Sequence, residues 1–292
     1  MFRGTFTALV TPFRNGEIDF EALERLIEEQ IAARIDGLVA IGTTGESPTL
    51  SHHEREEVIR FFISKANKRC LVLAGTGSYA TRDAIAATQN AEKLGADGAL
   101  IVAPYYNKPS QEGLFRHFSE IARGTSLRIM LYNIPPRCGV DIAAETVGRL
   151  VEAHANIVSI KEASGSVDRV SELRSRLPEE VTILSGDDGL TLPFMAVGAV
   201  GVVSVISNLL PAEIAALVRA QASGNNAEAE RLHRRLYRLF KDCFIEPNPV
   251  PIKTAMAWRG KISPEVRLPL CEMSPENQQR LRATLDAFET AG

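Results

Sequence analysis

The most reactive group that the sequence offers is a lysine that directly follows an apolar run. Residues 157–160 are mostly β-branched and apolar, which predicts a buried strand, and Lys161 comes next. Burial would remove water from the Lys161 amine and lower its pKa, and the neutral amine could then form an imine with a carbonyl compound. A lysine at this place can also keep its ammonium group in solvent while its stem packs, so the neighbouring residues must decide.

Further polar residues follow other apolar runs at equivalent places. Thr43 and Thr44 stand between glycines, in a segment that can form a plain turn or bind an anion through backbone N–H groups. Tyr132 ends another apolar run, where a tyrosine can either pack or take part in acid–base chemistry. Arg137 follows shortly afterwards and is either a solvated loop residue or a receptor for a carboxylate, which its planar guanidinium fits.

The sequence indicates no metal site. Asp187 and Asp188 follow an apolar run, but no histidine or cysteine stands near them at ligand spacing, so we interpret them as caps of the next helix. His52 and His53 lack the spacing of a zinc-binding H-E-x-x-H helix and are expected on the surface. We therefore expect chemistry that does not use a metal.

Apolar runs recur about every thirty residues, which is the size of a βα unit. The predicted strands are 6–10, 38–41, 71–74, 99–103, 129–132, 157–160, 182–184 and 200–205. Segments with helical periodicity lie between them, at 20–33, 54–66, 81–94, 111–123, 143–153, 167–177 and 190–197. This alternation predicts an α/β fold with a parallel sheet closed into a (β/α)8 TIM barrel. An open doubly wound sheet is the alternative, but no G-x-G-x-x-G segment follows the first run.

The last part of the chain contains no clear strand. It predicts helices over 226–244, 251–258 and 275–287, with a proline-rich stretch after the first. We therefore divide the chain into a catalytic barrel domain, 1–224, and a C-terminal helical extension, 225–292. Active sites of such barrels lie at the carboxyl ends of the strands, so the polar residues that follow the runs should share one face.

Composition excludes several classes of protein. The chain has 292 residues, 45% of them hydrophobic, and a net charge of −3, which gives no reason to expect nucleic acid or a membrane surface as a partner. The four cysteines are far apart and form no C-x-x-C pair, as expected of reduced thiols in the cytoplasm. No apolar run could span a bilayer, and the N-terminus lacks the apolar region of a signal peptide.

Four segments make the sequence recognisable. They are Gly-Thr-Thr-Gly-Glu ending at Glu46, Tyr-Asn-Ile-Pro-Pro-Arg ending at Arg137, Ile-Lys-Glu-Ala-Ser-Gly around Lys161, and Ser-Gly-Asp-Asp ending at Asp188. Together they resemble the signature motifs of the dihydrodipicolinate synthases, also called 4-hydroxy-tetrahydrodipicolinate synthases, a family of pyruvate-dependent class I aldolases. The resemblance covers the whole chain, including the tail segment Glu-Pro-Asn-Pro-Val-Pro-Ile-Lys that ends at Lys253.

The resemblance implies a Schiff-base condensation of pyruvate with L-aspartate 4-semialdehyde in the diaminopimelate route to lysine. It implies no cofactor besides the covalent imine, a cytoplasmic location and a homotetramer built from tight dimers. The catalytic residues would be Lys161 for the imine and Tyr132 for proton transfer, with Thr43 and Tyr106 as relay partners, the latter from a neighbouring subunit. The implied substrate-binding residues are Thr44 for pyruvate, Arg137 for the semialdehyde carboxylate, and Gly186 and Val203 as lining.

Two other functions compete with this one. Another pyruvate-dependent class I aldolase or lyase that acts on a sugar acid would share the lysine. Thr43 stands at the position of the serine in the Gly-Ser-Thr-Gly-Glu motif that neuraminate lyases resemble. This threonine and Arg137 favour the synthase instead. A barrel that binds a carboxylate effector without turnover is the second alternative, because fold alone does not fix function. Such a binding protein would have no need for both Lys161 and Tyr132.

A site for feedback by lysine can be matched in part. Lysine-sensitive relatives bind the amino acid at the dimer interface, and the matching positions here are Ser47, His52, Arg55, Tyr79, Asp83 and Tyr105. Arg55 replaces a histidine of many sensitive relatives, Tyr79 an asparagine and Asp83 a glutamate. Arg55 adds a positive charge near a cationic ligand, and Tyr79 fills space. We therefore expect weak or absent inhibition by L-lysine.

Overall fold

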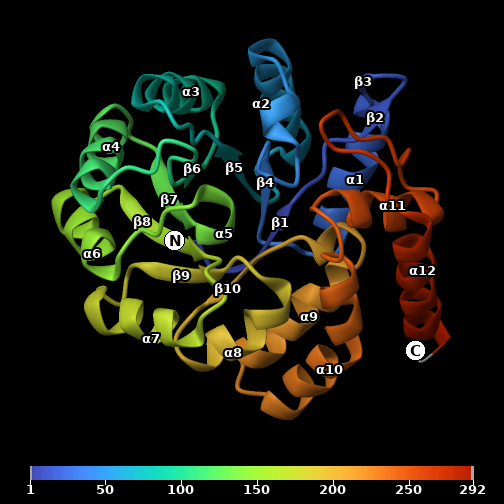
Figure 1. The fold of residues 1–292 in the computed structure, drawn as a ribbon. Helices are drawn as coiled ribbons and strands as arrows, with labels where there is room; N and C mark the ends of the chain where they lie inside the picture. Colours follow the sequence, from blue (N-terminus) through green and yellow to red (C-terminus); the bar gives the residue numbers. More distant parts are fainter. Residues whose placement is uncertain (1, 291–292) are drawn as a thin grey trace.

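Eight parallel strands close into a barrel in the computed structural model, which describes residues 2–290 (Figure 1). The first strand of the barrel pairs with both its second and its last strand, so the predicted closed TIM barrel is confirmed. The barrel strands are β1 (Gly4–Ala8), β4 (Gly37–Ala40), β5 (Leu71–Gly75), β6 (Gly98–Val102), β7 (Arg128–Asn133), β8 (Ile157–Glu162), β9 (Thr182–Ser185) and β10 (Gly201–Ser204).

Helices surround the barrel, and most of them lie within two residues of the predicted ranges. They are α1 (Phe20–Ala32), α2 (His52–Ala66), α3 (Thr81–Leu94), α4 (Gln111–Arg123), α6 (Ala144–Ala153), α7 (Val167–Arg176), α8 (Thr191–Ala196) and α9 (Pro211–Ala222). Three elements were not predicted from the sequence. They are α9, the short helix α5 (Pro135–Cys138), and the antiparallel ribbon of β2 (Phe13–Arg14) and β3 (Glu17–Ile18).

Side-chain caps explain where two of these helices begin. The Asp19 carboxylate accepts a hydrogen bond from the Ala22 N–H at the start of α1. At the start of α2, the Ser51 hydroxyl accepts from the Glu54 N–H, and the Glu54 carboxylate accepts from the Ser51 N–H. This reciprocal capping box satisfies two N–H groups that the helix itself cannot pair.

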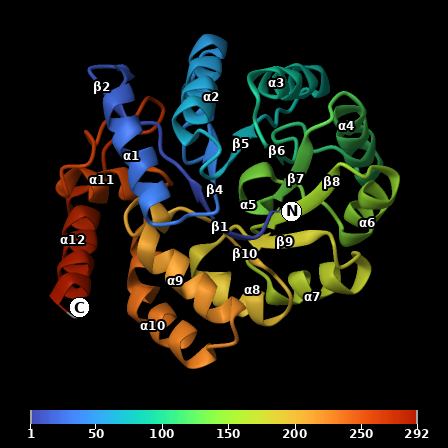
Figure 2. The ribbon, with the colours of Figure 1, turned by 180° about the vertical axis from the view of Figure 1, so that it is seen from behind.

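The C-terminal extension packs along one side of the barrel. Its helices are α10 (Asn226–Asp242), α11 (Val250–Trp258) and α12 (Pro275–Thr290). Helix α10 packs against α9, and α12 packs against α10 and α11 (Figures 1 and 2). The extension also meets α1, through the ion pair of Lys261 with Glu29. None of the helices within residues 2–290 is long and apolar enough to cross a membrane.

Apolar side chains fill the inside of the barrel. They form one buried cluster: Phe2, Phe6, Ala8, Val39, Leu73, Leu100, Met130, Tyr132, Leu184 and Val203. The rings of Phe2 and Phe6 meet edge to face, with centroids 5.9 Å apart. Gly37 makes room for this pair, because a Cβ there would lie 2.2 Å from Cε1 of Phe6. The amino ends of β1 and β4 are therefore packed with rings, and polar groups gather toward the carboxyl ends.

Candidate functional site

Lys161 lies inside β8 and not just beyond it, because the strand continues to Glu162. Its side chain is only 5% exposed, and Nζ lies 4.0 Å from the centre of the Tyr132 ring. Burial lowers the pKa of Lys161 to about 7; the charge of Asp188 opposes this shift, and that of Arg137 adds to it. A large fraction of the Lys161 amine is therefore uncharged near neutral pH and can attack a carbonyl carbon.

Tyr132 stands directly beside Lys161, since the two are register partners in β7 and β8. Burial raises the pKa of Tyr132 to about 12, although the Arg137 charge and a side-chain hydrogen bond with Thr43 act in the opposite direction. The Tyr132 hydroxyl is therefore protonated at neutral pH, as a proton donor must be, although the raised pKa makes it a weaker acid. To act later as a base it needs partners that stabilise the tyrosinate, and Thr43 is one such partner.

The loop after β4 holds the two predicted threonines in an unusual backbone shape. It starts at Ile41 with φ of 50° and ends at Glu46 with φ of 53°, both in the left-handed region that non-glycine residues rarely adopt. Each such residue costs about 1–3 kcal/mol, which favourable contacts elsewhere in the structure must offset. Glycine at position 75 lets the loop pack closely against β5, because a Cβ there would lie 2.5 Å from the Ile41 carbonyl oxygen.

Asn248 connects the two residues that the sequence analysis assigned to carboxylate binding. Its Nδ2 donates to Oγ1 of Thr44 at 3.0 Å, and its carbonyl oxygen accepts from Nη2 of Arg137 at 3.3 Å. Arg137 lies on the short helix α5 and is exposed. This role of Asn248 was not predicted, although an asparagine between two prolines was a signal for it in the sequence.

Gly186 and Val203 complete the surroundings of the lysine. A Cβ at Gly186 would lie 3.0 Å from Cε of Lys161 and 2.7 Å from Cβ of Ala163, so glycine leaves the space that the lysine stem needs. Val203 lies on β10 within the buried barrel cluster that also contains Tyr132. The structure thus gathers most of the predicted catalytic and substrate-binding residues around Lys161.

Asp188 is a buried carboxylate beside this group, and the interpretation of it as a helix cap was wrong. It accepts hydrogen bonds from the Ser204 hydroxyl and from the N–H groups of Val205 and Ile206, the latter two at 2.8 and 3.3 Å. Burial raises the pKa of Asp188 to about 6 despite these donors. Asp187 does cap, because its carboxylate accepts from the Gly189 N–H. His52 and His53 are exposed, as predicted.

Tyr106 stands apart from the predicted site residues within one chain. Its side chain is 91% exposed and its φ is 70°, so the backbone is strained to hold a ring in solvent. Its neighbour Tyr105 is half-buried, and its ring meets the ring of Tyr79 edge to face at 5.3 Å. Because the Tyr106 ring is exposed, its predicted role would require a contact with another chain.

A cavity of about 590 Å³ joins the predicted effector residues to the site. Thr43 and Arg137 are among its lining residues. All six effector candidates line it as well: Ser47, His52, Arg55, Tyr79, Asp83 and Tyr105. The Arg55 guanidinium is held at the wall of this cavity, since its Nη2 donates to the Ser47 carbonyl oxygen at 2.7 Å and its Nε to that of Leu50 at 3.2 Å.

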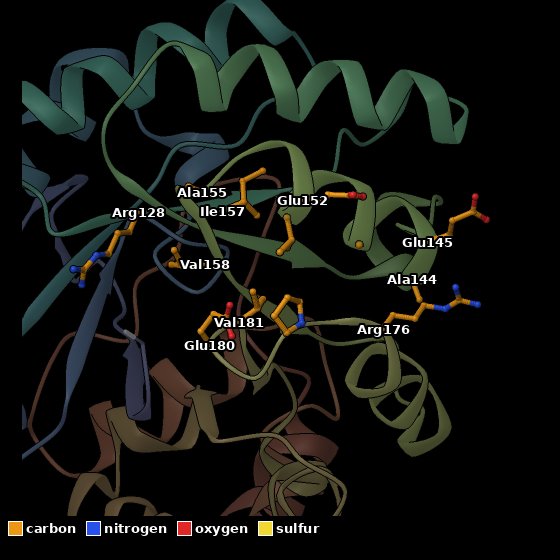
Figure 3. Close-up of a pocket in the computed structure, with 13 residues that line it drawn as sticks. Arg128, Ala144, Glu145, Glu152, Ala155, Ile157, Val158, Arg176, Glu180 and Val181 are labelled. Atoms are coloured by element: carbon orange, nitrogen blue, oxygen red, sulfur yellow. The ribbon is translucent and has the colours of Figure 1, made fainter.

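A second cavity, of about 860 Å³, lies away from these groups at the amino ends of β7 and β8 (Figure 3). Arg128 stands at one end of it, and Glu145 and Arg176 stand at the other. Ile157 and Val181 form part of its apolar lining. None of the residues predicted for catalysis, substrate binding or the effector lines this cavity. The chemistry therefore belongs to the carboxyl end of the barrel.

Comparison with known proteins agrees with this geometry. Residues 1–288 match the Dihydrodipicolinate synthetase family. A 4-hydroxy-tetrahydrodipicolinate synthase of Persephonella marina is 51% identical over 289 residues, which cover 99% of this chain and 99% of that protein.

Solved structures give the same result. The 4-hydroxy-tetrahydrodipicolinate synthase of the thermoacidophilic methanotroph Methylacidiphilum fumariolicum SolV matches with a TM-score of 0.99 at 59% identity, over 99% of this chain and 97% of that one. The dihydrodipicolinate synthase of Aquifex aeolicus matches with a TM-score of 0.97 at 48% identity, over 99% and 98% of the two chains. The similarity thus extends along the whole chain, including the helical extension.

Proposed function

The chain belongs to the dihydrodipicolinate synthetase family, and we propose that it condenses pyruvate with L-aspartate 4-semialdehyde through an imine on Lys161. The observation that carries this proposal is the buried Lys161 amine, 4.0 Å from the Tyr132 ring and with its pKa lowered to about 7. The reaction belongs to the diaminopimelate route to lysine. It needs no cofactor, because the imine itself withdraws electrons from the substrate.

Imine formation is the first step. The neutral Lys161 amine attacks the ketone carbon of pyruvate, and the resulting carbinolamine loses water to give a positively charged iminium ion. The Tyr132 hydroxyl donates the proton that lets hydroxide leave as water. Asp188 raises the pKa of Lys161 through its charge, so it also favours the positive iminium over the neutral carbinolamine.

Carbon–carbon bond formation follows. The iminium ion acidifies the pyruvate methyl group, and loss of one methyl proton gives an enamine that attacks the aldehyde carbon of the second substrate. The alkoxide that forms takes a proton, and the amino group of the semialdehyde then displaces Lys161 to close the ring. Tyr132 moves these protons, and its partners in the relay are Thr43 and Tyr106. Thr43 is within reach of Tyr132 through a side-chain hydrogen bond.

Two groups receive the substrate carboxylates. Thr44, together with Thr43, binds the pyruvate carboxylate at the strained loop after β4. Arg137 binds the carboxylate of the semialdehyde, for which its guanidinium is suited. Gly186 and Val203 line the space through their backbone. Arg137 and Thr43 also favour this function over that of a sugar-acid aldolase, which would need hydroxyl-binding groups for a longer substrate.

The assembly that we propose is a cytoplasmic homotetramer built from tight dimers. Its support is Tyr106, whose exposed ring and strained backbone make sense if a second copy of the chain receives the ring. Tyr79, whose carbonyl oxygen accepts from the Asn107 side chain, is also half exposed, and protein interfaces are enriched in tyrosine. Each active site would then contain a tyrosine from its neighbour.

We propose that L-lysine, which would bind in the effector cavity, inhibits the protein weakly or not at all. Arg55 places a permanent positive charge where a cationic ligand would have to bind, and its bonds to the Ser47 and Leu50 carbonyls hold it there. Tyr79 is bulkier than the asparagine of sensitive relatives, and Asp83 is one methylene shorter than their glutamate. A direct contact of Asp83 with the ligand would become a contact through water.

Reduction with borohydride in the presence of pyruvate tests the function. We expect the intact mass to increase by one reduced pyruvyl unit and peptide mapping to find the label on Lys161. Lys161→Met should remove labelling, whereas Lys108→Met, a change at an exposed lysine, should leave it unchanged. Label on Lys108 or Lys253 would refute the assignment. A panel of aldehydes then separates the functions, since turnover of sugar acids with none of the semialdehyde would contradict the synthase.

Mixing of two inactive variants tests the shared active site. Lys161→Met removes the nucleophile, and Tyr106→Phe removes a relay hydroxyl, which should cost about 10²–10⁴-fold in rate. In a randomly mixed dimer population about one quarter of the sites would combine an intact lysine with an intact partner tyrosine. We therefore expect activity to return to about that fraction. Subunit exchange shown by native mass spectrometry without recovered activity would argue against the arrangement.

Initial rates over a titration with L-lysine test the effector proposal. We expect little inhibition up to millimolar concentrations, because Arg55 repels the ligand and Tyr79 occupies its space. The double variant Arg55→His, Tyr79→Asn should gain inhibition, which provides the matched control. Strong partial inhibition of the unchanged protein at low lysine concentration would show that the cavity tolerates both residues.

A further inference from the structure

Two fully buried charges meet behind the loop after β4. Lys253 lies on α11 and Glu46 at the end of the loop, 207 residues apart in the chain, and Nζ lies 2.6 Å from Oε1. Both side chains are 0% exposed. Neither charge takes part in the chemistry proposed above, so the pair calls for an explanation of its own.

Further contacts fix the geometry of this pair. Nζ of Lys253 also donates to the Thr11 carbonyl oxygen at 2.9 Å and lies 4.3 Å from the centre of the Phe13 ring. The second oxygen of Glu46 accepts from the Arg267 N–H at 3.0 Å. Burial lowers the pKa of Lys253, and the charge of Glu46 acts in the opposite direction. The Glu46 carboxylate is thus held at both oxygens by the C-terminal extension.

Glu46 transmits this constraint to the substrate-binding loop. Its backbone is left-handed, and its N–H donates to the Thr43 carbonyl oxygen at 3.1 Å. The Thr11 hydroxyl donates to the Gly45 carbonyl oxygen at 2.8 Å, so the residue before Glu46 is tied as well. A change in the position of the Glu46 side chain would therefore move the backbone of Thr43, which carries one of the carboxylate-binding hydroxyls.

The same tail segment contacts the other half of the site. Asn248, five residues before Lys253, donates to the Thr44 hydroxyl and accepts from Arg137. Oδ1 of Asn248 is buried without a hydrogen-bond partner. The extension therefore reaches the loop at two places, once through the Glu46 carboxylate and once through the Thr44 side chain.

A buried ion pair contributes little to stability in itself, because removing two charges from water costs about as much as their attraction returns. Apolar residues of similar volume would fill the same space at least as well. The pair does fix the orientation of both side chains, because each oxygen of Glu46 and two of the donor directions of Lys253 have a fixed partner. We propose that Lys253 and Glu46 are positioning residues, which hold the Thr43–Thr44 loop in the shape that binds the pyruvate carboxylate. This inference rests on the proposed function.

A double variant separates positioning from stability. Lys253→Met or Glu46→Gln alone leaves a buried polar group poorly paired and should lower the melting temperature. Glu46→Gln combined with Lys253→Met removes both charges and keeps an acceptor for the Arg267 N–H, so it should recover part of that loss. We expect the double variant nevertheless to need about 10- to 100-fold more pyruvate for half-maximal borohydride trapping at Lys161, because the loop is misplaced. The KM for the semialdehyde and the kcat at saturating pyruvate should change much less.

Lys261→Met is the matched control. Lys261 also belongs to the extension and pairs with a barrel residue, Glu29 on α1, but it does not contact the loop. We expect the pyruvate dependence of trapping to stay at the wild-type value in this variant. If the double variant does not fold, Glu46→Gln alone provides the same measurement, since its amide offers one acceptor oxygen and cannot hold both Lys253 and the Arg267 N–H.

The outcomes separate the two proposals. A double variant, or Glu46→Gln in its place, that folds and binds pyruvate as the wild type does would overturn the positioning role while the proposed function stands. The same would follow if Lys261→Met weakened pyruvate binding as much. Absence of trapping in the wild type itself would overturn the proposed function and this inference together.

Discussion

The removal of water from one amine is the constraint on which the rest of the structure depends. An exposed lysine is protonated at neutral pH and cannot attack a ketone. Lys161 avoids this because β8 carries it into the barrel, where burial lowers its pKa to about 7. The barrel closes its other end with the rings of Phe2 and Phe6, so the apolar surroundings stay intact below the lysine. Asp188 limits the shift, and it supplies the negative charge that a positive imine needs nearby.

The C-terminal extension forms part of the site and is more than a covering layer. The strained loop after β4 and the arginine on α5 come from the barrel, yet Asn248 contacts both. Lys253 and the Arg267 N–H, which also belong to the extension, hold the Glu46 carboxylate. The groups proposed to bind carboxylates are thus arranged by chain segments that lie about two hundred residues apart. This arrangement explains why the similarity to the synthases continues through the extension, which contains none of the proposed catalytic residues.

Sequence patterns predicted the barrel well because they depend on local physics. Most barrel strands contain a short apolar run, and helices such as α3 and α4 coincide with segments of clear helical periodicity. Motif resemblance supplied the site residues around Lys161. Partners far apart in the chain escaped prediction, since nothing near Glu46 indicates that Lys253 will bury beside it. The role of Asp188 was misread for the same reason: its donors come from β10 and the residues beyond it. The Tyr106 ring is exposed in one chain, so the role proposed for it would require a second chain.

The titration of Lys161 tests the central claim most directly. In protein labelled with ¹³C-lysine, the Cε resonance that is absent from Lys161→Met belongs to this residue, and its chemical shift reports the protonation of the amine. We expect the midpoint near pH 7, with the amine charged below that pH and neutral above it. A midpoint near 10.4, the value of an exposed lysine, would show that burial does not activate the amine and would contradict the account.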